Sequence, residues 1–366
     1  MAKKFLFSDL SLCLQKGQSL LALFAACFSL QATGQTSVFT DAQTVSSAGQ
    51  LRASHWLSKS LQSSSQSHWM LYRFDIGLTH AKTDWEFELA KTRQGYFFGN
   101  TNALFLAAQD NADKDIDLTT LGRFAIRAET WSLEAHRLAA TYKWKLSPQL
   151  TFRIEPHLLL IQDYQHARGE LSLLNESNTN QLQGQLNRVG TRQYGYLIQD
   201  QPDAGWGMGL HFNGSYESSL GQLDWRIQNL YSQLKFSTLH YSNRQYLVQT
   251  QAGQIKVSNI PSLTGTYGLG PRRESLPMAW QMLLTPGLLP DIRLGVVGME
   301  RQARLLLRYE RGLNTGRWWL QTIQAENWSA GLTWSVLSQL ELGMAISTTD
   351  RLRSPMLTSI QGRISW

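Results

Sequence analysis

The chain contains little cysteine, little proline and little charge. Its two cysteines, Cys13 and Cys27, lie within the first 34 residues, so the rest of the chain has no disulfide, thiolate metal site or thiol nucleophile. The net charge of +7 comes without any run of basic residues, which disfavours nucleic-acid binding. The histidines are scattered without ligand spacing, so we predict neither a metal nor another cofactor. No later stretch approaches the length of a membrane-spanning helix.

The first 34 residues are predicted to be a cleaved secretory signal. The basic start contains Lys3, Lys4 and Lys16, and an apolar core follows at residues 19–30. Small residues at 32–34 then form the cleavage site. The mature chain would then begin at Gln35, and residues 35–50 are predicted to be a flexible leader. Cys27 lies in a loose likeness to a lipoprotein signal, which leaves lipidation as an alternative.

Aromatic residues are abundant, and apolar residues recur with period two. In residues 68–79 every even position from 70 to 78 is apolar, and residues 138–146, 152–160, 328–336 and 340–347 repeat the pattern. Such segments are strands with one apolar face. In lipid, strands of this kind must close into a ring. The pattern predicts an all-β protein with a transmembrane, antiparallel, up-and-down barrel over residues 51–366. The expected strand number is even, 16 within a range of 12–18. A soluble β-sandwich is the alternative, although its exposed face would carry more charge.

The chain ends on an amphipathic segment whose last residue is aromatic. Ile360, Gly362, Ile364 and Trp366 occupy one face of this segment. It resembles the C-terminal signal of outer-membrane β-barrels of Gram-negative bacteria, and the resemblance names this class rather than one family. It implies an integral outer-membrane location, contact with outer-membrane lipids and lipopolysaccharide, and recognition by the barrel-assembly machinery.

Alternation also assigns a mildly basic set of side chains to the barrel interior. Its basic members include Arg73, Lys143, Lys145, Arg153, Arg226, Arg304 and Arg308. A basic, water-filled interior would favour anions, including acidic or phosphorylated sugars. Alternatively, these cations pair with interior carboxylates and fill the barrel. The leading hypothesis is a pore, or a barrel for export or assembly of a solute or polymer, without catalytic residues.

One short motif suggests catalysis. His240-Tyr241-Ser242-Asn243 resembles the His-x-Ser-Asn element of outer-membrane phospholipase A and of lipid A deacylases. The resemblance implies acyl ester cleavage with Ser242 as nucleophile and His240 as base, two residues apart on one strand face. Arg244 replaces the usual small residue, and only the amide Gln254 stands where an acid is needed. Counting turns places Ser242 toward the periplasmic end.

A third hypothesis is a surface receptor or adhesion scaffold. Residues 162–204 are rich in Asn, Gln, Gly and Ser, and are predicted to form a long loop that either is extracellular or folds into the lumen. As an extracellular loop it would serve as the binding element. The stretch 110–117 is predicted to be an acidic loop. The glycines at 205, 207 and 209 alternate inward along one strand, where they would let bulky neighbours approach the wall.

Overall fold

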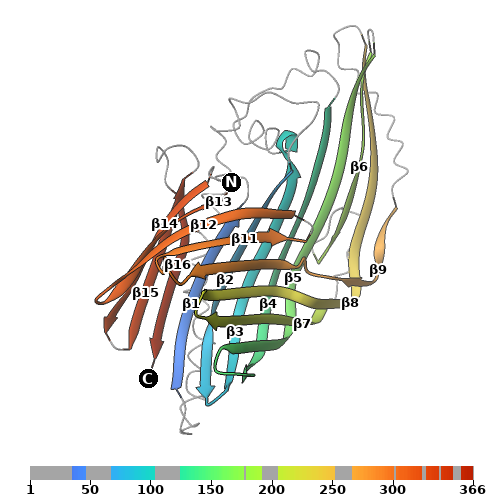
Figure 1. Cartoon of the computed structure of the whole chain (residues 1–366). Coiled ribbons are helices and arrows are strands. Elements are labelled where there is room, and N and C mark those ends of the chain that lie inside the picture. The colour runs from blue at the N-terminus through green and yellow to red at the C-terminus, as the bar shows by residue number, and fades with distance from the viewer. Residues whose placement is uncertain are drawn as a thin grey trace.

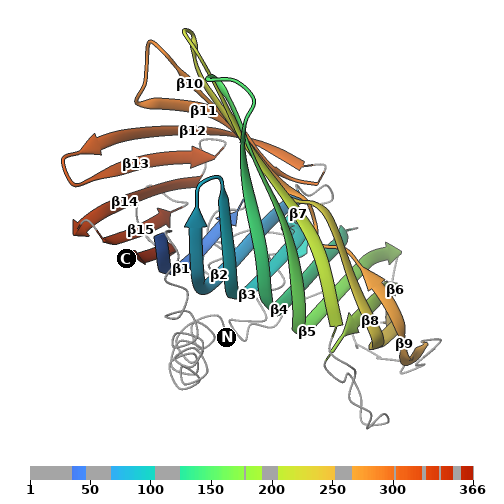
Figure 2. The same ribbon diagram turned by 90° about the horizontal axis from the view of Figure 1, so that it is seen from below.

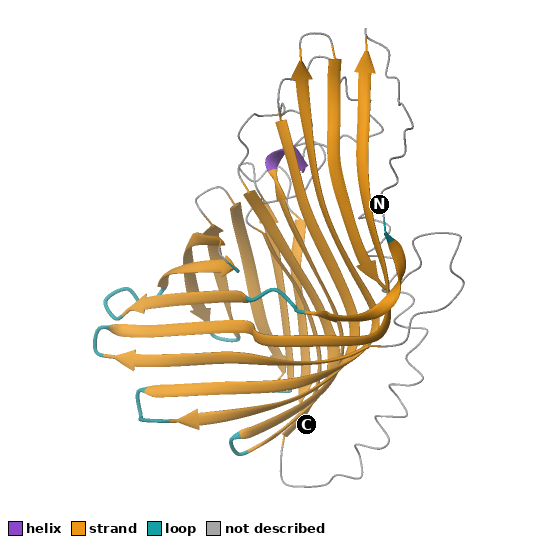
Figure 3. Cartoon of the chain, turned by 90° about the vertical axis from the view of Figure 1, so that its right-hand side faces the viewer, coloured by secondary structure: helices purple, strands orange, loops and turns teal. Residues whose placement is uncertain are grey.

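The computed structural model describes residues 35–46, 67–103, 124–176, 179–191, 205–251, 266–300, 302–323, 327–337, 339–348 and 356–365. The signal segment 1–34, the stretch 110–117 and the final Trp366 lie outside these residues. Apart from a single helical turn at 101–103 and the connecting turns, the described chain is β-strand (Figure 3). No helix in the described part is long and apolar enough to cross a membrane.

Sixteen strands follow one another along the chain (Figure 1). They are β1 (Gln35–Ser46), β2 (Ser67–Lys82), β3 (Trp85–Asn100), β4 (Phe124–Lys145), β5 (Leu150–Glu176), β6 (Thr179–Gly190), β7 (Gly205–Ser218), β8 (Gly221–Gln251), β9 (Tyr267–Glu274), β10 (Ala279–Pro286), β11 (Ile292–Met299), β12 (Gln302–Leu313), β13 (Gly316–Ile323), β14 (Asn327–Leu337), β15 (Leu340–Thr348) and β16 (Met356–Ser365).

Fourteen of these strands form a closed antiparallel ring. The ring runs from β1 through β5 to β7, β8 and β10, continues to β16, and closes where β16 pairs with β1. The two remaining strands, β6 and β9, lie outside the ring. β6 pairs with the distal parts of β5 and β8, and β9 pairs with β8. The predicted up-and-down barrel and the predicted total of 16 strands are confirmed.

The outer face of the ring is apolar, as the alternation predicts. Leu138, Leu158 and Leu160 are exposed, whereas their neighbours Ala139 and Leu159 face inward and are buried. Around the rest of the ring the exposed side chains include Trp206, Met282, Leu294, Leu305, Leu332 and Met344. A soluble sandwich hides such residues between its sheets. A closed ring with an apolar exterior is the architecture that lipid requires.

One end of the ring, here called the turn end, carries the short turns at residues 83–84, 146–149, 219–220, 287–291 and 314–315, and the turn residue Gln339. Among the described residues, the turn at Glu300 lies at the opposite end. In the second of these turns, the Ser147 hydroxyl accepts hydrogen bonds from the backbone N–H groups of Gln149 and Leu150, which fixes the reversal around Pro148. The opposite end is called the far end.

The wall is much higher on one side than on the other (Figure 2). β4, β5 and β8 have 22, 27 and 31 residues, whereas β10 to β16 have 8 to 12. About 9–11 residues of a tilted strand cross the apolar layer of a bilayer. The long strands therefore continue beyond the barrel at the far end. There, residues 163–176 of β5, β6, residues 238–251 of β8 and β9 form a sheet extension, here called the wing.

Two predictions about the chain's organisation were wrong. Residues 35–46 form β1 rather than a leader, because backbone pairing with β2 and β16 holds a strand whose outward residues are only weakly apolar. Residues 162–176 and 179–190 form the upper part of β5 and all of β6 rather than a loop. The apolar outward face of these segments is interrupted, with Leu171 and Leu186 each opposite a glycine, because the segments stand beyond the apolar belt of the barrel.

Candidate functional site

The register of the ring brings three of the predicted interior cations into one line. Lys143 of β4 pairs with Arg153 of β5, Arg153 pairs with Asn213 of β7, and Asn213 pairs with Arg226 of β8. Residues paired in this way point to the same face of a sheet. We call Lys143, Arg153 and Arg226, with Asn213 between the arginines, the basic row.

The basic row faces the interior because its neighbours in sequence face outward. Phe152, Phe212 and Trp225 form an aromatic cluster on the other side of the same strands, with the Phe152 ring centroid 5.5 Å from that of Phe212 and 5.8 Å from that of Trp225.

The basic row is not neutralised by the described chain. None of the ion pairs among the described residues involves Lys143, Arg153 or Arg226, and the side-chain amide of Gln228 lies beside the Arg226 guanidinium. Lys143 and Arg153 oppose each other directly, which is an unfavourable pairing of like charges. The side-chain oxygen of Asn213 is buried without a hydrogen-bond partner in this part of the structure. The row is therefore a concentrated positive site.

A second interior cluster, here called the Arg137 network, is neutralised. Arg137, which is 5% exposed, donates hydrogen bonds to Glu88 and to Glu155, the latter over 3.0 Å. Arg73 donates to Asp75 over 2.6 Å, and Asp75 lies 3.7 Å from the Arg137 guanidinium. Two cations thus face three carboxylates. For Arg73 the pairing alternative holds, and this residue does not contribute a free positive charge.

On the opposite side of the ring, three guanidinium groups surround the carboxylate of Glu310. Glu310 lies 2.8 Å from Arg308, 3.3 Å from Arg317 and 3.5 Å from Arg293, and Arg308 also stacks on the Trp319 ring at 4.6 Å. This Glu310 cluster retains a net positive charge. Arg304 lies on the same inner face of β12, four residues from Arg308 toward the far end. Lys145 is exposed at the turn end.

An apolar collar lines the interior beyond the charged residues. On strand after strand the inward charged positions give way, toward the far end, to buried apolar ones: Trp69, Leu133, Leu159, Ile161, Leu234, Phe236, Val297, Leu306 and Ile323. The inward glycines of β7 create room for this packing. An added Cβ at Gly205 would lie 2.4 Å from Phe236, and one at Gly207 would lie 2.5 Å from Leu234. The prediction that these glycines admit bulky neighbours is confirmed.

Glu155, His157 and His211 are the one group among the described residues whose spacing would suit a metal ion. The Nδ1 atom of His211 accepts a hydrogen bond of 3.0 Å from the backbone N–H of Asn229. A neutral His211 therefore carries its proton on Nε2, the nitrogen that faces Glu155, and has no lone pair to offer there. Ligating histidines usually donate from their second nitrogen instead. The geometry fits a hydrogen-bonded structural cluster and does not fit a metal site.

His240 and Ser242 lie on the wing, close to the far end rather than the turn end. They share one face of β8, as their spacing predicts, opposite Gly190 and Arg188 of β6. His240 is 0% exposed, and both of its ring nitrogens are buried without a hydrogen-bond partner within the described chain. A serine nucleophile needs a base within hydrogen-bond reach. That contact is not made here, and Gln254 lies outside the described residues.

The proposed assembly segment coincides with β16. Ile360 and Ile364 are exposed on the outer face, and Arg363 points inward, with its guanidinium 3.6 Å from Glu86. Gly362 pairs with Thr40 of β1 at the closing seam. The apolar and polar faces predicted for this segment are therefore the outer and inner faces of the closing strand.

No protein-family profile matches the chain, and no curated protein is similar to it in sequence. Several solved structures resemble it in fold, including one transporter and one translocator domain. The toluene transporter TodX of P. putida is 11% identical with a TM-score of 0.36, over 92% of this chain and 89% of that one. The translocator domain of the autotransporter NalP from Neisseria meningitidis is 9% identical with a TM-score of 0.31, over 98% and 96%. The closed antiparallel ring with its apolar exterior is itself the architecture of a transmembrane β-barrel.

Proposed function

We propose that this chain is an exported, integral barrel of the Gram-negative outer membrane that forms a pore or transport path with a preference for anions. The basic row is the observation that carries this proposal. It concentrates three cations on neighbouring strands in the interior, without a carboxylate partner among the described residues. In the same interior, the cations of the Arg137 network are fully paired.

Charge of one sign inside a narrow, low-dielectric wall attracts counter-ions more strongly than the same charge in water. Rings of charged side chains set selectivity in this way. A solute entering from the turn end would meet Lys145, the basic row and the Glu310 cluster before the apolar collar. The collar narrows the path, so conduction requires that the collar be wetted or displaced.

Four further elements of the proposal concern the outer surface and the two ends of the barrel. The apolar exterior contacts outer-membrane lipids, and the wing stands among lipopolysaccharide at the far end, which is the extracellular side. The turn end is the periplasmic side, as in bacterial barrels with short periplasmic turns. β16 would be the strand that the assembly machinery recognises.

Planar-bilayer recording under a salt gradient tests the anion preference. The variant Lys143→Gln, Arg153→Gln, Arg226→Gln removes the basic row. Its matched control, Lys82→Gln, Lys235→Gln, Arg311→Gln, removes three outward cations, each paired across the strands with an exposed tryptophan. Heat-dependent mobility in a denaturing gel verifies that both variants are folded.

We expect an anion-favouring reversal potential for the wild type and the control, and a potential near zero for the basic-row variant. A folded wild type that stays silent, or a reversal potential that the basic-row variant leaves unchanged, would refute the proposal. The lipid-hydrolase alternative is not favoured, because the His240 ring makes no hydrogen bond to a nucleophile.

A further inference from the structure

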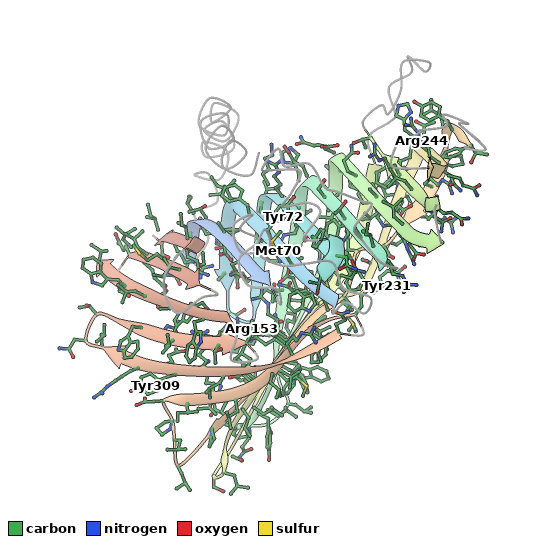
Figure 4. All side chains as sticks on the ribbon, turned by 90° about the horizontal axis from the view of Figure 1, so that it is seen from above. Met70, Tyr72, Arg153, Tyr231, Arg244 and Tyr309 are labelled. Atoms are coloured by element: carbon green, nitrogen blue, oxygen red, sulfur yellow. The ribbon has the colours of Figure 1, made fainter. Side chains whose placement is uncertain are left out.

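The inner face of the wing, which overlooks the barrel mouth, consists of amides and paired charges in register. One row across four strands contains Arg127, Glu170, Gln185 and Gln245, and the next contains Glu129, Arg168, Asn187 and Asn243. We call these eight residues the amide face. The wing is distinct from the barrel interior: in Figure 4, Arg244 on the wing lies well apart from Arg153 of the basic row.

The amide face is hollowed. Arg127, Glu170, Ser172, Gln183, Gln185 and Gln245 line a concavity of about 580 Å³. Ligand pockets typically enclose about 300–1,000 Å³. The hollow is bounded by β4, β5, β6 and β8, whose long distal parts have no role in crossing a bilayer. The wing therefore provides a rigid sheet outside the apolar layer with a concave polar surface.

Glu170 and Asn243 of the amide face retain hydrogen-bonding capacity. Glu170 lies 3.8 Å from Arg127 and 3.7 Å from Arg168, which is beyond hydrogen-bond length, and both guanidinium groups are more than 60% exposed. The side-chain oxygen of Asn243 is buried and has no partner among the described residues. A buried acceptor left unpaired is unfavourable, and a ligand hydroxyl would satisfy it.

The charges of this surface cancel. Arg127 and Arg168 are matched by Glu129 and Glu170, so an anionic or cationic ligand gains no net attraction, in contrast to the basic row below. Glu129 is held by His166, whose Nε2 lies 3.0 Å away. The uncharged members are amides, each of which offers both donors and an acceptor. A partner protein would require an apolar, aromatic-rich centre, which the amide face lacks.

We propose that the amide face binds a neutral carbohydrate chain. Sugar hydroxyls both donate and accept hydrogen bonds, which matches alternating amides, guanidiniums and carboxylates. Neighbouring strands are about 4.8 Å apart and same-face residues along a strand about 7 Å apart. The two rows thus present a grid of contacts wide enough for several sugar units. This site is independent of the pore proposed above.

Binding of the detergent-solubilised full chain to an array of neutral and acidic oligosaccharides tests the proposal, followed by titration calorimetry with the best neutral oligosaccharide. The test variant is Gln185→Leu, Asn243→Leu, which keeps side-chain size and removes the hydrogen bonds. The control is Gln149→Leu, which alters an exposed amide in a turn at the opposite end. Heat-dependent gel mobility again reports folding.

We expect at least one neutral oligosaccharide to bind, with affinity reduced about tenfold or more in the double variant and unchanged in the control. Binding that persists at high salt would agree with recognition by uncharged groups. Three outcomes would overturn the proposal: no oligosaccharide bound, equal affinity in a folded double variant, or binding confined to acidic glycans and abolished by salt. Reversal potentials are unaffected by any of these outcomes, so the pore is judged separately.

Discussion

The hydrogen bonds of His166 predict how tightly the wing is attached to the barrel at different pH values. His166 lies on β5, six residues beyond Leu160, which is the last exposed leucine among the described side chains of that strand, and therefore outside the apolar belt. Its Nε2 is 3.0 Å from Glu129 of β4, and its Nδ1 is 3.3 Å from Glu274 of β9. The hydroxyl of Tyr164 also donates to Glu274 over 3.2 Å. A protonated His166 thus joins three strands.

These two carboxylates raise the pKa of His166 from 6.5 to about 9. Because the folded state holds the proton more tightly, the stabilisation is complete below pH 6.5 and is lost as the pH rises through 9. At about 1.4 kcal/mol per tenfold change in proton affinity the full effect is about 3 kcal/mol. His166 is 26% exposed, so solvent screening reduces this to about 1–3 kcal/mol. Opening of β9 breaks the contact with Glu274 and leaves the contact with Glu129 in place, so only the lower part of this range applies. The opening of β9 should then become roughly fivefold more frequent.

Thiol labelling measures this opening, because the predicted mature chain has no cysteine of its own. In one variant a cysteine replaces the buried Leu276, just after β9, and in a second variant a cysteine replaces Leu288, which is 96% exposed. The measured quantity is the ratio of the first labelling rate to the second. We expect the ratio to increase between pH 6.5 and 9.5. In the His166→Gln background it should be high already and independent of pH. A flat ratio in the parent protein, or the same slope without His166, would refute the reasoning.

Three other substitutions give sharp expectations. Gly209→Ala places a Cβ 2.3 Å from Nε2 of His157. It should therefore lower the unfolding free energy by about 1–3 kcal/mol, which the urea midpoint measures. Adding His157→Ala to this variant should restore most of the lost stability. Glu310→Gln removes the carboxylate shared by three arginines. It should lower the urea midpoint and shift the reversal potential further toward anions, whereas an unchanged potential would place the Glu310 cluster off the conduction path. Ser242→Ala should leave phospholipid hydrolysis at the level of the unaltered protein, since His240 does not contact a nucleophile; a loss of hydrolysis in the variant would restore the hydrolase hypothesis.

The barrel was predictable because lipid imposes a strict alternation on the strands that cross it. Residues 68–79 and 328–336 show this alternation without interruption, and each forms a transmembrane strand. Beyond the belt the constraint disappears, so the upper part of β5 and all of β6 had only an interrupted apolar pattern by which to be recognised as strands. β1 was missed for a related reason, because Thr40 and Ala42 on its outward face are barely apolar.

The inner surface was predictable only in part. Alternation shows that Arg73 and Arg153 both point inward, but the register decides which of them finds a carboxylate. Arg73 has Asp75 two residues away on its own strand, whereas Arg153 is opposed by Lys143. That pairing depends on the turn at 146–149 and on the bulge further along β4 and β5. Neither can be derived from composition.

The seam between β1 and β16 has a consequence for how the molecule is made. Ser37 and Ser365 are hydrogen-bonded over 2.9 Å although 328 positions separate them in the chain. Contacts between such distant residues form slowly, because the chain must lose much of its freedom before they can be made. Until β16 is available, β1 can pair only with β2. An open sheet with an apolar outer surface would be prone to aggregate. We therefore expect the apolar face to need protection until β16 is available to pair with β1.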